Sequence, residues 1–398
     1  MITVREVHDL MARHVGPLAP ISCARAEAHG RVLREPVAAA EDIPAFDRSA
    51  MDGYAVRADD TSKEFEVVGE IRAGDFIDLE LKPGQAVSIF TGGRLPGARL
   101  KVVMQENVRV EGTRLRITKP APESHVRHRS EDARAGEILL QPGVVLEAAA
   151  VALLASLGRT TVQVSPLPRI LHLTTGDEIV LPEQAPAPGQ IRNSNASLMA
   201  ALCREHGAGE VTHFHARDDW DELLRIVSEA GSGNFDMVLV SGGSGPGAYD
   251  FTGKLLDRLG ATIHSRQVNV RPGKPLIFGT IAQQAVFGLP GNALSHFVCF
   301  HLFVRRALDR LLDRPVTATL SALLAEDVAD AGNARETWWP VCAQVESGRL
   351  ECRALPWKSS GDITRLPGAH ALMKVPASTS HLRAGTMVEI LPTRLFAF

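Results

Sequence analysis

The feature that most constrains the fold is the alternation of strand-like and helix-like segments that begins near residue 166. The strand-like runs are residues 169–175 (RILHLTT), 211–216 (VTHFHA), 236–243 (DMVLVSGG) and 261–268 (ATIHSRQV). The helix-like segments between them are residues 195–207, 218–231 and 250–260. Strands that alternate with helices of about 10–15 residues indicate crossover connections. The sequence therefore predicts an α/β domain, a parallel sheet with helices on both faces.

The first 165 residues follow a different pattern. Residues 4–14 and 22–34 have the spacing of short amphipathic helices, and residues 146–158 form a further helix-like segment. Between them, residues 54–120 contain short strand-like runs and turn residues, without a helical period of adequate length. We therefore predict a β-rich unit inserted into a discontinuous domain whose first and later helices pack together.

The chain after residue 291 supplies the last part of the predicted organisation. Residues 292–313 form a long helix-like segment, and Pro315 marks a break. The tail contains only short alternating runs, which are typical of a small β domain. The predicted domains are a discontinuous linker domain (residues 1–45 and 132–165), an inserted β-rich domain (46–131), an α/β domain (166–313) and a C-terminal β domain (316–398).

Composition excludes several classes of protein. Lys and Arg number 43 against 46 Asp and Glu, so the net charge of −3 lacks the basic excess of a nucleic-acid-binding protein. The five cysteines are scattered and none has CxxC spacing, which argues against a zinc knuckle, a redox pair or a disulfide framework. The N-terminus carries charges throughout, unlike a signal peptide, and the apolar run at 296–304 is far shorter than the ~20 residues that span a bilayer. We expect a soluble, cytoplasmic protein.

Four loops of unusual composition follow the predicted strands. In an open parallel sheet, ligands bind at the carboxyl ends of the strands, where loops lead into helices. The loops at such ends are residues 174–179 (TTGDEI), 241–250 (SGGSGPGAYD), 268–275 (VNVRPGKP) and 288–292 (GLPGN). We therefore predict that one site is built from all four.

The second of these loops is rich in glycine. Glycine allows close backbone approach and positive φ, so that several N–H groups can point at one anion, and the following helix adds its N-terminal partial charge. The alternative is a tight turn that binds nothing. The loop lacks the GK[ST] of a phosphate-binding P-loop and the glycine spacing of a dinucleotide-binding fold. Its glycines are Gly242, Gly243, Gly245 and Gly247.

Charged residues are expected at the same edge of the sheet. Arg271 and Lys274 lie around a Pro-Gly turn and suit phosphate or an oxyanion such as molybdate, although a solvated hairpin tip is the alternative. Carboxylates beside phosphate-binding groups make sense where Mg²⁺ bridges them to the ligand, although Asp250 is also suited to cap its helix. The carboxylates predicted there are Asp177, Glu178, Asp236 and Asp250.

Histidine and serine patterns give little support for other chemistry. His213 and His215 share one face of a strand, and His296 and His301 are five residues apart on a helix. Neither pair has a metal-binding spacing with a third ligand, so we expect core or surface histidines. There is no GxSxG motif and no cysteine placed as a nucleophile, so covalent catalysis is disfavoured.

Eight motifs in this order resemble those of one family. They are FDRSAMDGYAV (46–56), TGGRLPGA (91–98), VVMQEN (102–107), RHRSEDARAG (127–136), TTGDEI (174–179), SGG..GAYD (241–250), RPGKP (271–275) and GLPGN (288–292). Over nearly its whole length, the chain resembles the molybdopterin molybdenumtransferase family, bacterial relatives of the C-terminal domain of gephyrin.

The resemblance implies both a fold and an activity. The implied fold is a multidomain α/β and β chain, with a central parallel α/β domain like the molybdopterin-adenylylating proteins, a discontinuous helical linker domain, an inserted β-rich domain and a small C-terminal β-barrel. Members of the family insert molybdate into adenylylated molybdopterin, release AMP and form molybdenum cofactor, with Mg²⁺ as the usual divalent cation. The alternatives are a non-catalytic scaffold on the same fold, a pterin or nucleotide carrier, and a variant that prefers tungstate.

The resemblance also implies partners and site residues. The implied assembly is a homodimer with each site between the α/β domain of one subunit and parts of its partner, and the implied partners are the molybdopterin-adenylylating protein and molybdoenzyme chaperones. The catalytic candidates are Asp52, Asp132, Glu178, Asp236 and Lys274. The substrate-binding candidates are Thr91, Thr175, Gly176, Asp177, Ser241, Gly242, Gly243, Gly245, Gly247, Asp250, Arg271, Pro275, Pro290, Gly291, Asn292, Arg335 and Ser360. The candidate metal ligands are Glu178 and Asp250.

The sequence departs from the family pattern in two loops. Ser244 and Gly245 stand where the glycine loop of the family usually has Val and Ser, so a hydroxyl is lost at the second position. Ala293 follows the GLPGN motif where many relatives have Pro. The first change puts one ligand contact in question. It leaves the preference for molybdate or tungstate open, together with a paralogue of reduced activity.

Overall fold

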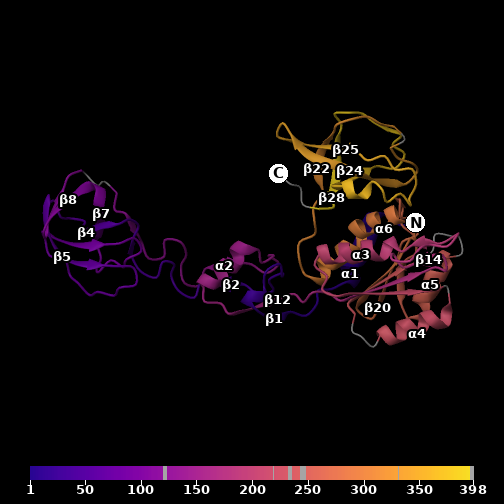
Figure 1. Ribbon diagram of the computed structural model, residues 1–398, viewed down its shortest axis with the longest axis horizontal. Helices are drawn as coiled ribbons and strands as arrows, with labels where there is room; N and C mark the ends of the chain where they lie inside the picture. The colour runs from indigo at the N-terminus through magenta and orange to yellow at the C-terminus, as the bar shows by residue number, and fades with distance from the viewer. Residues whose placement is uncertain (120–122, 218, 232–234, 243–247, 330, 395–398) are drawn as a thin grey trace. The chain divides into compact units, whose positions relative to one another are not determined.

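The computed structural model describes residues 1–119, 123–217, 219–231, 235–242, 248–329 and 331–394. It divides into two compact units, and Figure 1 labels some of their helices and strands. The first unit comprises Met1–Arg34, Gly143–Val151 and Thr160–Phe398, and the second unit comprises Glu35–Pro142 and Ala152–Arg159. Among the described residues, no helix combines the length and the apolar composition needed to cross a membrane.

A six-stranded sheet forms the centre of the first unit. Its strands, in spatial order, are β16 (Val211–Ala216), β13 (Ile170–Thr175), β17 (Met237–Ser241), β21 (Gln284–Leu289), β20 (Ile277–Ile281) and β18 (Thr262–Ser265). The first four are parallel: β16, β13 and β17 confirm three of the predicted strands, and β21 was not predicted. β20, also not predicted, is antiparallel to both of its neighbours, β21 and the predicted strand β18. The sheet is therefore mixed, because a tight hairpin joins β20 to β21 in place of a crossover helix.

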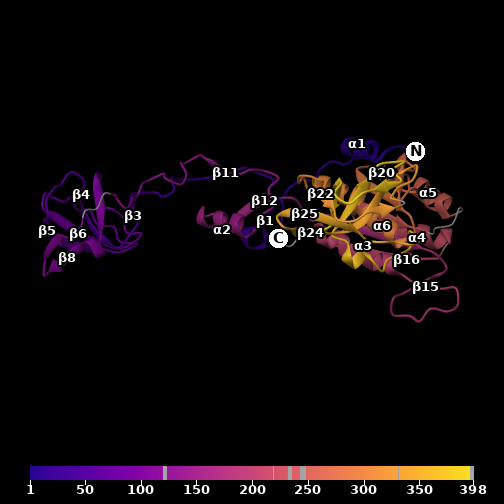
Figure 2. The same ribbon diagram turned by 90° about the horizontal axis from the view of Figure 1, so that it is seen from above.

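Helices cover both faces of this sheet (Figures 1 and 2). Successive side chains of β17 alternate between the faces: Met237 and Leu239 belong to one apolar core, and Val238 and Val240 to the other. The first core contains α1 (Val4–His14), α3 (Ser194–Glu205), α6 (Ala293–Cys299), a π-helical turn (Phe300–Val304) and α7 (Arg305–Leu311). The second core contains α4 (Trp220–Gly231) and α5 (Ala248–Arg258). The predicted long helix at 292–313 is thus confirmed, with one π-helical turn inside it.

The C-terminal part of the first unit is a closed barrel of five strands. The strands are β22 (Leu320–Leu324), β24 (Glu336–Glu346), β25 (Arg349–Ala354), β26 (Ala371–Val375) and β28 (Met387–Pro392). The barrel closes because β24 pairs with both β25 and β26. This confirms the predicted small β-barrel. A short strand, β19 (Val270–Arg271), also pairs in parallel with β24, so the backbone at Arg271 is fixed to the barrel.

The second unit contains the predicted β-rich insertion. Its sheet has the order β7 (Leu100–Met104), β4 (Gly53–Arg57), β6 (Gln85–Ile89), β5 (Glu64–Ile71), β9 (Arg114–Ile117) and β8 (Val108–Glu111). The other short strands of the chain are β2 (Val37–Ala38), β3 (Arg48–Ser49), β10 (Val126–Arg127), β11 (Ile138–Leu140), β14 (Ile179–Val180), β15 (Ile191–Arg192), β23 (Val328–Ala329) and β27 (His381–Leu382).

The predicted helix at 22–34 is wrong. Strand β1 (Ile21–Ala24) pairs antiparallel with β12 (Thr161–Val164), and a 3₁₀ turn (Arg25–Glu27) follows it. The cross-strand partner lies about 140 residues away in the sequence, so tertiary pairing overrides the local helical spacing. The later helix, α2 (Ala148–Ser156), is confirmed. Within the first unit, α1 packs against the π-helical turn and α7. Its packing with α2 stays a prediction.

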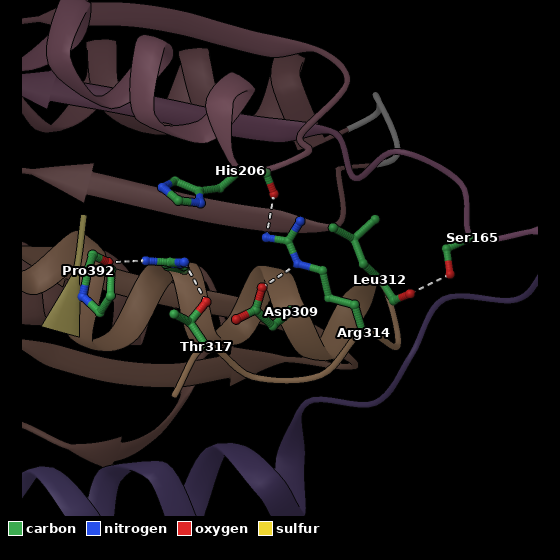
Figure 3. Close-up of polar contacts among 8 residues, drawn as sticks. Ser165, His206, Asp309, Leu312, Arg314, Thr317 and Pro392 are labelled. Carbon is green, nitrogen blue, oxygen red and sulfur yellow. Dashed lines mark hydrogen bonds and ion pairs between the residues drawn. The ribbon is translucent and has the colours of Figure 1, made fainter. Parts of the chain in front are cut away.

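Polar contacts join α7 and the residues that follow it to three other parts of the first unit (Figure 3). Arg314 donates to the carboxylate of Asp309 and, over 2.8 Å, to the carbonyl of His206 after α3. The hydroxyl of Ser165 donates to the carbonyl of Leu312. Arg305 donates over 2.7 Å to the carbonyl of Pro392, the last residue of the barrel strand β28. Asp309 is only 1% exposed, and a buried carboxylate is tolerated where it is paired in this way.

Candidate active site

A pocket of about 630 Å³ lies at the carboxyl edge of the central sheet. Gly242, after β17, and residues 271–275, after β18, line one part of it. Residues 288–292, which comprise the last two residues of β21 and the three that follow, line another. The barrel contributes Arg335 and residues 357–360. The fourth predicted loop, 174–179, lines an adjacent pocket of about 170 Å³ that shares Gly242, Gly291 and Asn292 with the first. The described parts of the four loops, with only Ser241 and Gly242 from the glycine-rich one, therefore lie at one edge of the sheet.

The larger pocket has a strongly cationic lining. Arg271, Lys274, Arg335 and Lys358 line it, and no Asp or Glu is among its described lining residues. Burial, and then the positive charge of Arg271, lower the pKa of the Arg335 guanidinium from its usual value. Arg271 and Arg335 repel one another, and no described acid of the lining offsets their charge. Binding of an anion is therefore favourable, because its negative charge reduces this repulsion. The pocket can therefore bind phosphate or another oxyanion.

The smaller pocket adds a carboxylate beside these cations. Glu178 is exposed and is the one acidic side chain among the described residues that line this pocket. Gly176 has φ of +142°, and a Cβ at this position would lie 2.7 Å from Oε2 of Glu178. The backbone conformation therefore favours glycine two residues before Glu178, and any larger side chain would displace the carboxylate from this position. Asp177, its neighbour, is exposed.

Close backbone approach is also required at Gly242. A Cβ here would lie 2.6 Å from Oγ1 of Thr252 and 3.0 Å from Oγ1 of Thr175. The Thr175 side chain is 4% exposed, and its hydroxyl has no hydrogen-bond partner among the described residues. A buried hydroxyl without a partner next to a ligand-binding loop is an unused donor. The structure thus brings Thr175 and Gly242 together beside the smaller pocket.

Ser241 connects two buried histidines beneath the site. The Ser241 hydroxyl lies 2.8 Å from Nε2 of His172 and 2.7 Å from Nε2 of His296. Nδ1 of His296 lies 3.3 Å from the carbonyl oxygen of Asn292 and donates to it, so Nε2 of His296 accepts from Ser241. Burial lowers the pKa of His296 to about 4 and that of His172 well below its usual value, so both rings are neutral. Ser241 therefore positions the end of β17 through this network.

The turn at 288–292 is fixed by two amides. Nδ2 of Asn292 donates over 2.7 Å to Oγ of Ser360, and Nδ2 of Asn195 donates over 2.6 Å to the carbonyl of Gly291. The backbone N–H of Leu294 donates to the carbonyl of Ser360. Ser360 therefore contacts the loop that follows β21 as well as lining the pocket. The predicted candidates Pro275 and Pro290 also line it.

The structure contradicts the placement of Asp236. This residue directly precedes β17 and accepts over 2.7 Å from the backbone N–H of Arg169, which directly precedes the parallel strand β13. Residues before parallel strands lie at the amino edge of a sheet, opposite the loops that follow the strands. Asp236 is therefore separated from the pocket by the length of β17, and the prediction that it lies beside Glu178 is wrong.

Three candidates lie in the second unit and are described within it. Oδ1 of Asp52 accepts from the backbone N–H and the hydroxyl of Thr91, each over 2.7 Å. These two bonds, the backbone bond first, lower the pKa of the Asp52 carboxyl below its usual value. Asp132 accepts from the guanidinium of Arg127. The structure thus brings Asp52 and Thr91 together, as ordered groups on exposed loops.

Some candidates fall outside the described residues. Gly243, Ser244, Gly245 and Gly247 belong to the segment that is not described, and Asp250 lies in α5 without a described side chain. In the part of the chain that is described, no group of three or more His, Cys, Asp or Glu side chains is arranged to bind a metal. His213 and His215 instead contact Oγ1 of Thr174, over 3.0 and 3.2 Å.

Sequence reasoning missed several residues that line the larger pocket. Trp357 and Lys358 lie just before the predicted candidate Ser360, and Gln267 precedes the RPGK loop. Their proximity to recognised motifs was the available signal. Ser295, on the first turn of α6, carried no such signal because it lies within an apolar helical run.

Comparison with known proteins gives matches along most of the chain. Three family models match the chain. The model described as "MoeA N-terminal region (domain I and II)" matches residues 2–158, the one described as "Probable molybdopterin binding domain" matches residues 172–310, and the one described as "MoeA C-terminal region (domain IV)" matches residues 321–393. The chain is similar to the molybdopterin molybdenumtransferase of a Nostoc species, with 36% identity over 92% of this chain and 86% of the relative. The Bacillus subtilis enzyme of that name is 31% identical over 92% of this chain and 87% of its own length.

A solved structure agrees with these matches. The molybdopterin biosynthesis MoeA protein from Pyrococcus horikosii superposes with a TM-score of 0.84 at 29% identity, over 99% of each chain.

Proposed function

Because the chain belongs to the molybdopterin molybdenumtransferase family, we propose that it inserts molybdate into adenylylated molybdopterin, releasing AMP and forming molybdenum cofactor. The observation that carries the proposal is the larger pocket, which Arg271, Lys274, Arg335 and Lys358 line and whose described lining residues include no acid. Molybdate is a dianion, and the adenylylated pterin carries phosphates. Both substrates therefore need the charge that this pocket supplies.

The roles of the pocket residues are mostly positional and electrostatic. Arg271 and Lys274 neutralise the oxyanion, and the backbone at Gly242 approaches the phosphates of the pterin substrate closely. The Thr175 hydroxyl, which has no partner among the described residues, donates to the same substrate. Asn292 and Ser360 fix the loop after β21 against the barrel, so that both walls of the pocket keep their spacing.

Mg²⁺ is proposed as the cofactor, with Glu178 as its protein ligand. Mg²⁺ is usually bound through one or two carboxylates together with substrate phosphates and water, so one exposed carboxylate at the edge of a cationic pocket fits it. When bound, the ion neutralises charge that develops on the phosphate of the departing AMP. Asp250 is proposed as a second ligand on the resemblance alone.

We also propose that the enzyme acts as a cytoplasmic homodimer, with Asp52, Thr91 and Asp132 contributing to the reaction. The proposed partners are the molybdopterin-adenylylating protein and molybdoenzyme chaperones. The proposed domains keep the predicted division into residues 1–45 with 132–165, 46–131, 166–313 and 316–398.

The proposed function is tested by incubating the purified protein with adenylylated molybdopterin, molybdate and Mg²⁺ and following AMP release. We expect AMP to appear only when all three are present. A scaffold would release no AMP under any condition. A pterin carrier would bind the adenylylated pterin without any dependence on molybdate, and a tungstate-preferring variant would reach half-maximal rate at a lower concentration of tungstate than of molybdate.

We expect Lys274→Ala to raise the molybdate concentration that gives half-maximal cofactor formation. Loss of one charge-assisted contact costs on the order of 1.5–3 kcal/mol, which corresponds to about a 10- to 150-fold rise. The half-saturating concentration of adenylylated pterin should change less, since its phosphates also contact backbone N–H groups. Lys374→Ala is the matched control: its ammonium lies near Glu336 and Glu389, and it does not line the pocket. An unchanged molybdate dependence in Lys274→Ala would leave RPGK as a solvated turn.

We expect sedimentation at micromolar concentration to give twice the mass of the 42.9 kDa chain. The reason is that the proposed site residues are spread from Asp52 to Arg335, across both compact units. A stable monomer that still releases AMP would show that no partner subunit is needed for the reaction.

A further inference from the structure

The Arg271 guanidinium lies over the face of Trp357, and both side chains line the larger pocket. The guanidinium carbon is 5.0 Å from the centroid of the Trp357 ring. The backbone of Arg271 is fixed by the pairing of β19 with β24. Trp357 is in turn packed edge-on against Trp339, with ring centroids 5.7 Å apart, and Nε1 of Trp339 donates to the carbonyl of Leu355. The aromatic face beneath Arg271 is therefore held in place from the barrel side.

No carboxylate balances Arg271 within the described part of the pocket. The lining contains no Asp or Glu, and the neighbouring cation, Arg335, has its pKa lowered by burial and by the charge of Arg271. Arg335 is itself fixed, because Nη1 donates over 3.1 Å to the carbonyl of Val270. Repulsion from Arg335 would turn a free Arg271 side chain toward solvent. Stacking on an aromatic face opposes that, since it stabilises a guanidinium without adding negative charge.

We infer that Trp357 is a positioning residue for the oxyanion: its indole face keeps the Arg271 guanidinium beside Arg335, so that both charges are in place before a dianion binds. The inference rests on the proposed function for the identity of the dianion, molybdate. A carboxylate in the position of Trp357 would hold Arg271 equally well but would cancel the charge that the ligand needs. An aromatic face avoids this, and it lowers the loss of side-chain freedom on binding.

Two variants separate the ring face from the rest of the side chain. Trp357→Phe keeps an aromatic face and removes Nε1–H, which has no hydrogen-bond partner among the described residues, so no hydrogen bond is lost. Trp357→Leu removes the face and keeps an apolar side chain. We expect molybdate binding, measured by calorimetry without pterin, to weaken about 2- to 30-fold in Trp357→Leu and by less than about 2-fold in Trp357→Phe.

Kinetic measurements distinguish a positioning role of Trp357 from a purely structural one. If Trp357 acts through Arg271, then in Trp357→Leu the rate of AMP release at saturating molybdate and the half-saturating pterin concentration stay within about 2-fold of wild type. In an Arg271→Ala background, Trp357→Leu should add no further loss of molybdate affinity, because the group that it positions is gone. Circular dichroism checks that each variant is folded, and Trp357→Met replaces Trp357→Leu if the latter is not.

Three outcomes would overturn the inference. They are unchanged molybdate affinity in the variant without a ring, equal losses in Trp357→Phe and Trp357→Leu, and an equal loss in the presence and absence of Arg271. Failure of the proposed function gives a different result: the wild-type protein would release no AMP, while calorimetry with molybdate would still report whether Trp357 and Arg271 act together.

Discussion

Replacing Glu178 with Gln is expected to abolish AMP release while leaving the protein folded. Glu178 is the one acidic side chain among the described residues lining the two adjacent pockets, so no described neighbour can take over its charge. Gln keeps the size of the side chain and removes the charge that a cation or a reacting water needs. Because the side chain is exposed, the free energy of unfolding should change by no more than about 0.5 kcal/mol. AMP release and urea unfolding of the purified variant measure the two effects.

Glu183→Gln is the matched control for this variant. Glu183 is an exposed acid five residues further along the same segment and does not line either pocket, so its loss should leave turnover unchanged. If Glu178 binds Mg²⁺, raising the Mg²⁺ concentration should restore part of the turnover of Glu178→Gln and leave that of Glu183→Gln as it is. Turnover close to wild type in Glu178→Gln would remove this residue from the mechanism.

The position of the site was predictable because strand direction determines where loops go. Once residues 169–175 and 236–243 are recognised as parallel strands, the loops that follow them must lie at one edge of the sheet. TTGDEI and Gly242 meet there for this reason alone. The same rule shows why Asp236 was misplaced: it was treated as part of a strand whose later residues approach the site, whereas it stands before the strand.

Elements defined by distant partners were not predictable. The hairpin of β20 and β21 was not recognised, although residues 277–289 are mostly apolar, because the two runs are separated only by Ala282 and Gln283. Ala282 adopts φ of +50°, a conformation that its side chain gives no reason to expect. Strand β1 was mistaken for a helix because its partner, β12, lies in another part of the sequence.

The barrel side of the site was only partly predictable. Arg335 and Ser360 were identified through a resemblance, whereas Trp357 and Lys358 were not, since neither belongs to a quoted motif. Their contribution depends on where β24 meets β19, which no local pattern specifies. The stacking of Arg271 on Trp357 joins residues 86 positions apart and can be seen only after the barrel is packed against the α/β domain.

Buried histidines of the first unit lead to the second large expected effect, a loss of stability in mild acid. Burial is the first cause that lowers the pKa of His8 and His296 to about 4 and that of His206 to about 3. The pKa values of His172 and His301 are lowered well below the usual 6.5, again mainly by burial. Each ring therefore stays neutral in the folded protein at a pH where the unfolded chain binds a proton.

The sign of the effect follows from proton linkage. Below pH 6.5 the unfolded state binds more protons than the folded state, so the free energy of unfolding falls as the pH falls, and the full stability is present only above that pH. For each neutral histidine the slope rises from about 0.7 kcal/mol per pH unit at pH 6.5 to about 1.4 kcal/mol at pH 5. The three most deeply buried rings, His172, His296 and His301, together contribute on the order of 5 kcal/mol over this range. Carboxylates such as Glu6, whose pKa is lowered from 4.5, titrate below this range.

Urea unfolding at pH 7, 6.5, 5.5 and 5, monitored by tryptophan fluorescence, measures the stability of the first unit. All four tryptophans lie in the first unit, as do these five histidines. His301→Leu should reduce the pH dependence by about one proton without the loss of a hydrogen bond, because neither ring nitrogen of His301 has a partner among the described residues. His128→Leu, which removes an exposed histidine of the second unit, should leave the slope of this fluorescence transition unchanged. A free energy of unfolding that stays constant between pH 7 and 5 would show that the buried rings take up protons in the folded state, and would contradict the neutral His172–Ser241–His296 network beneath the site.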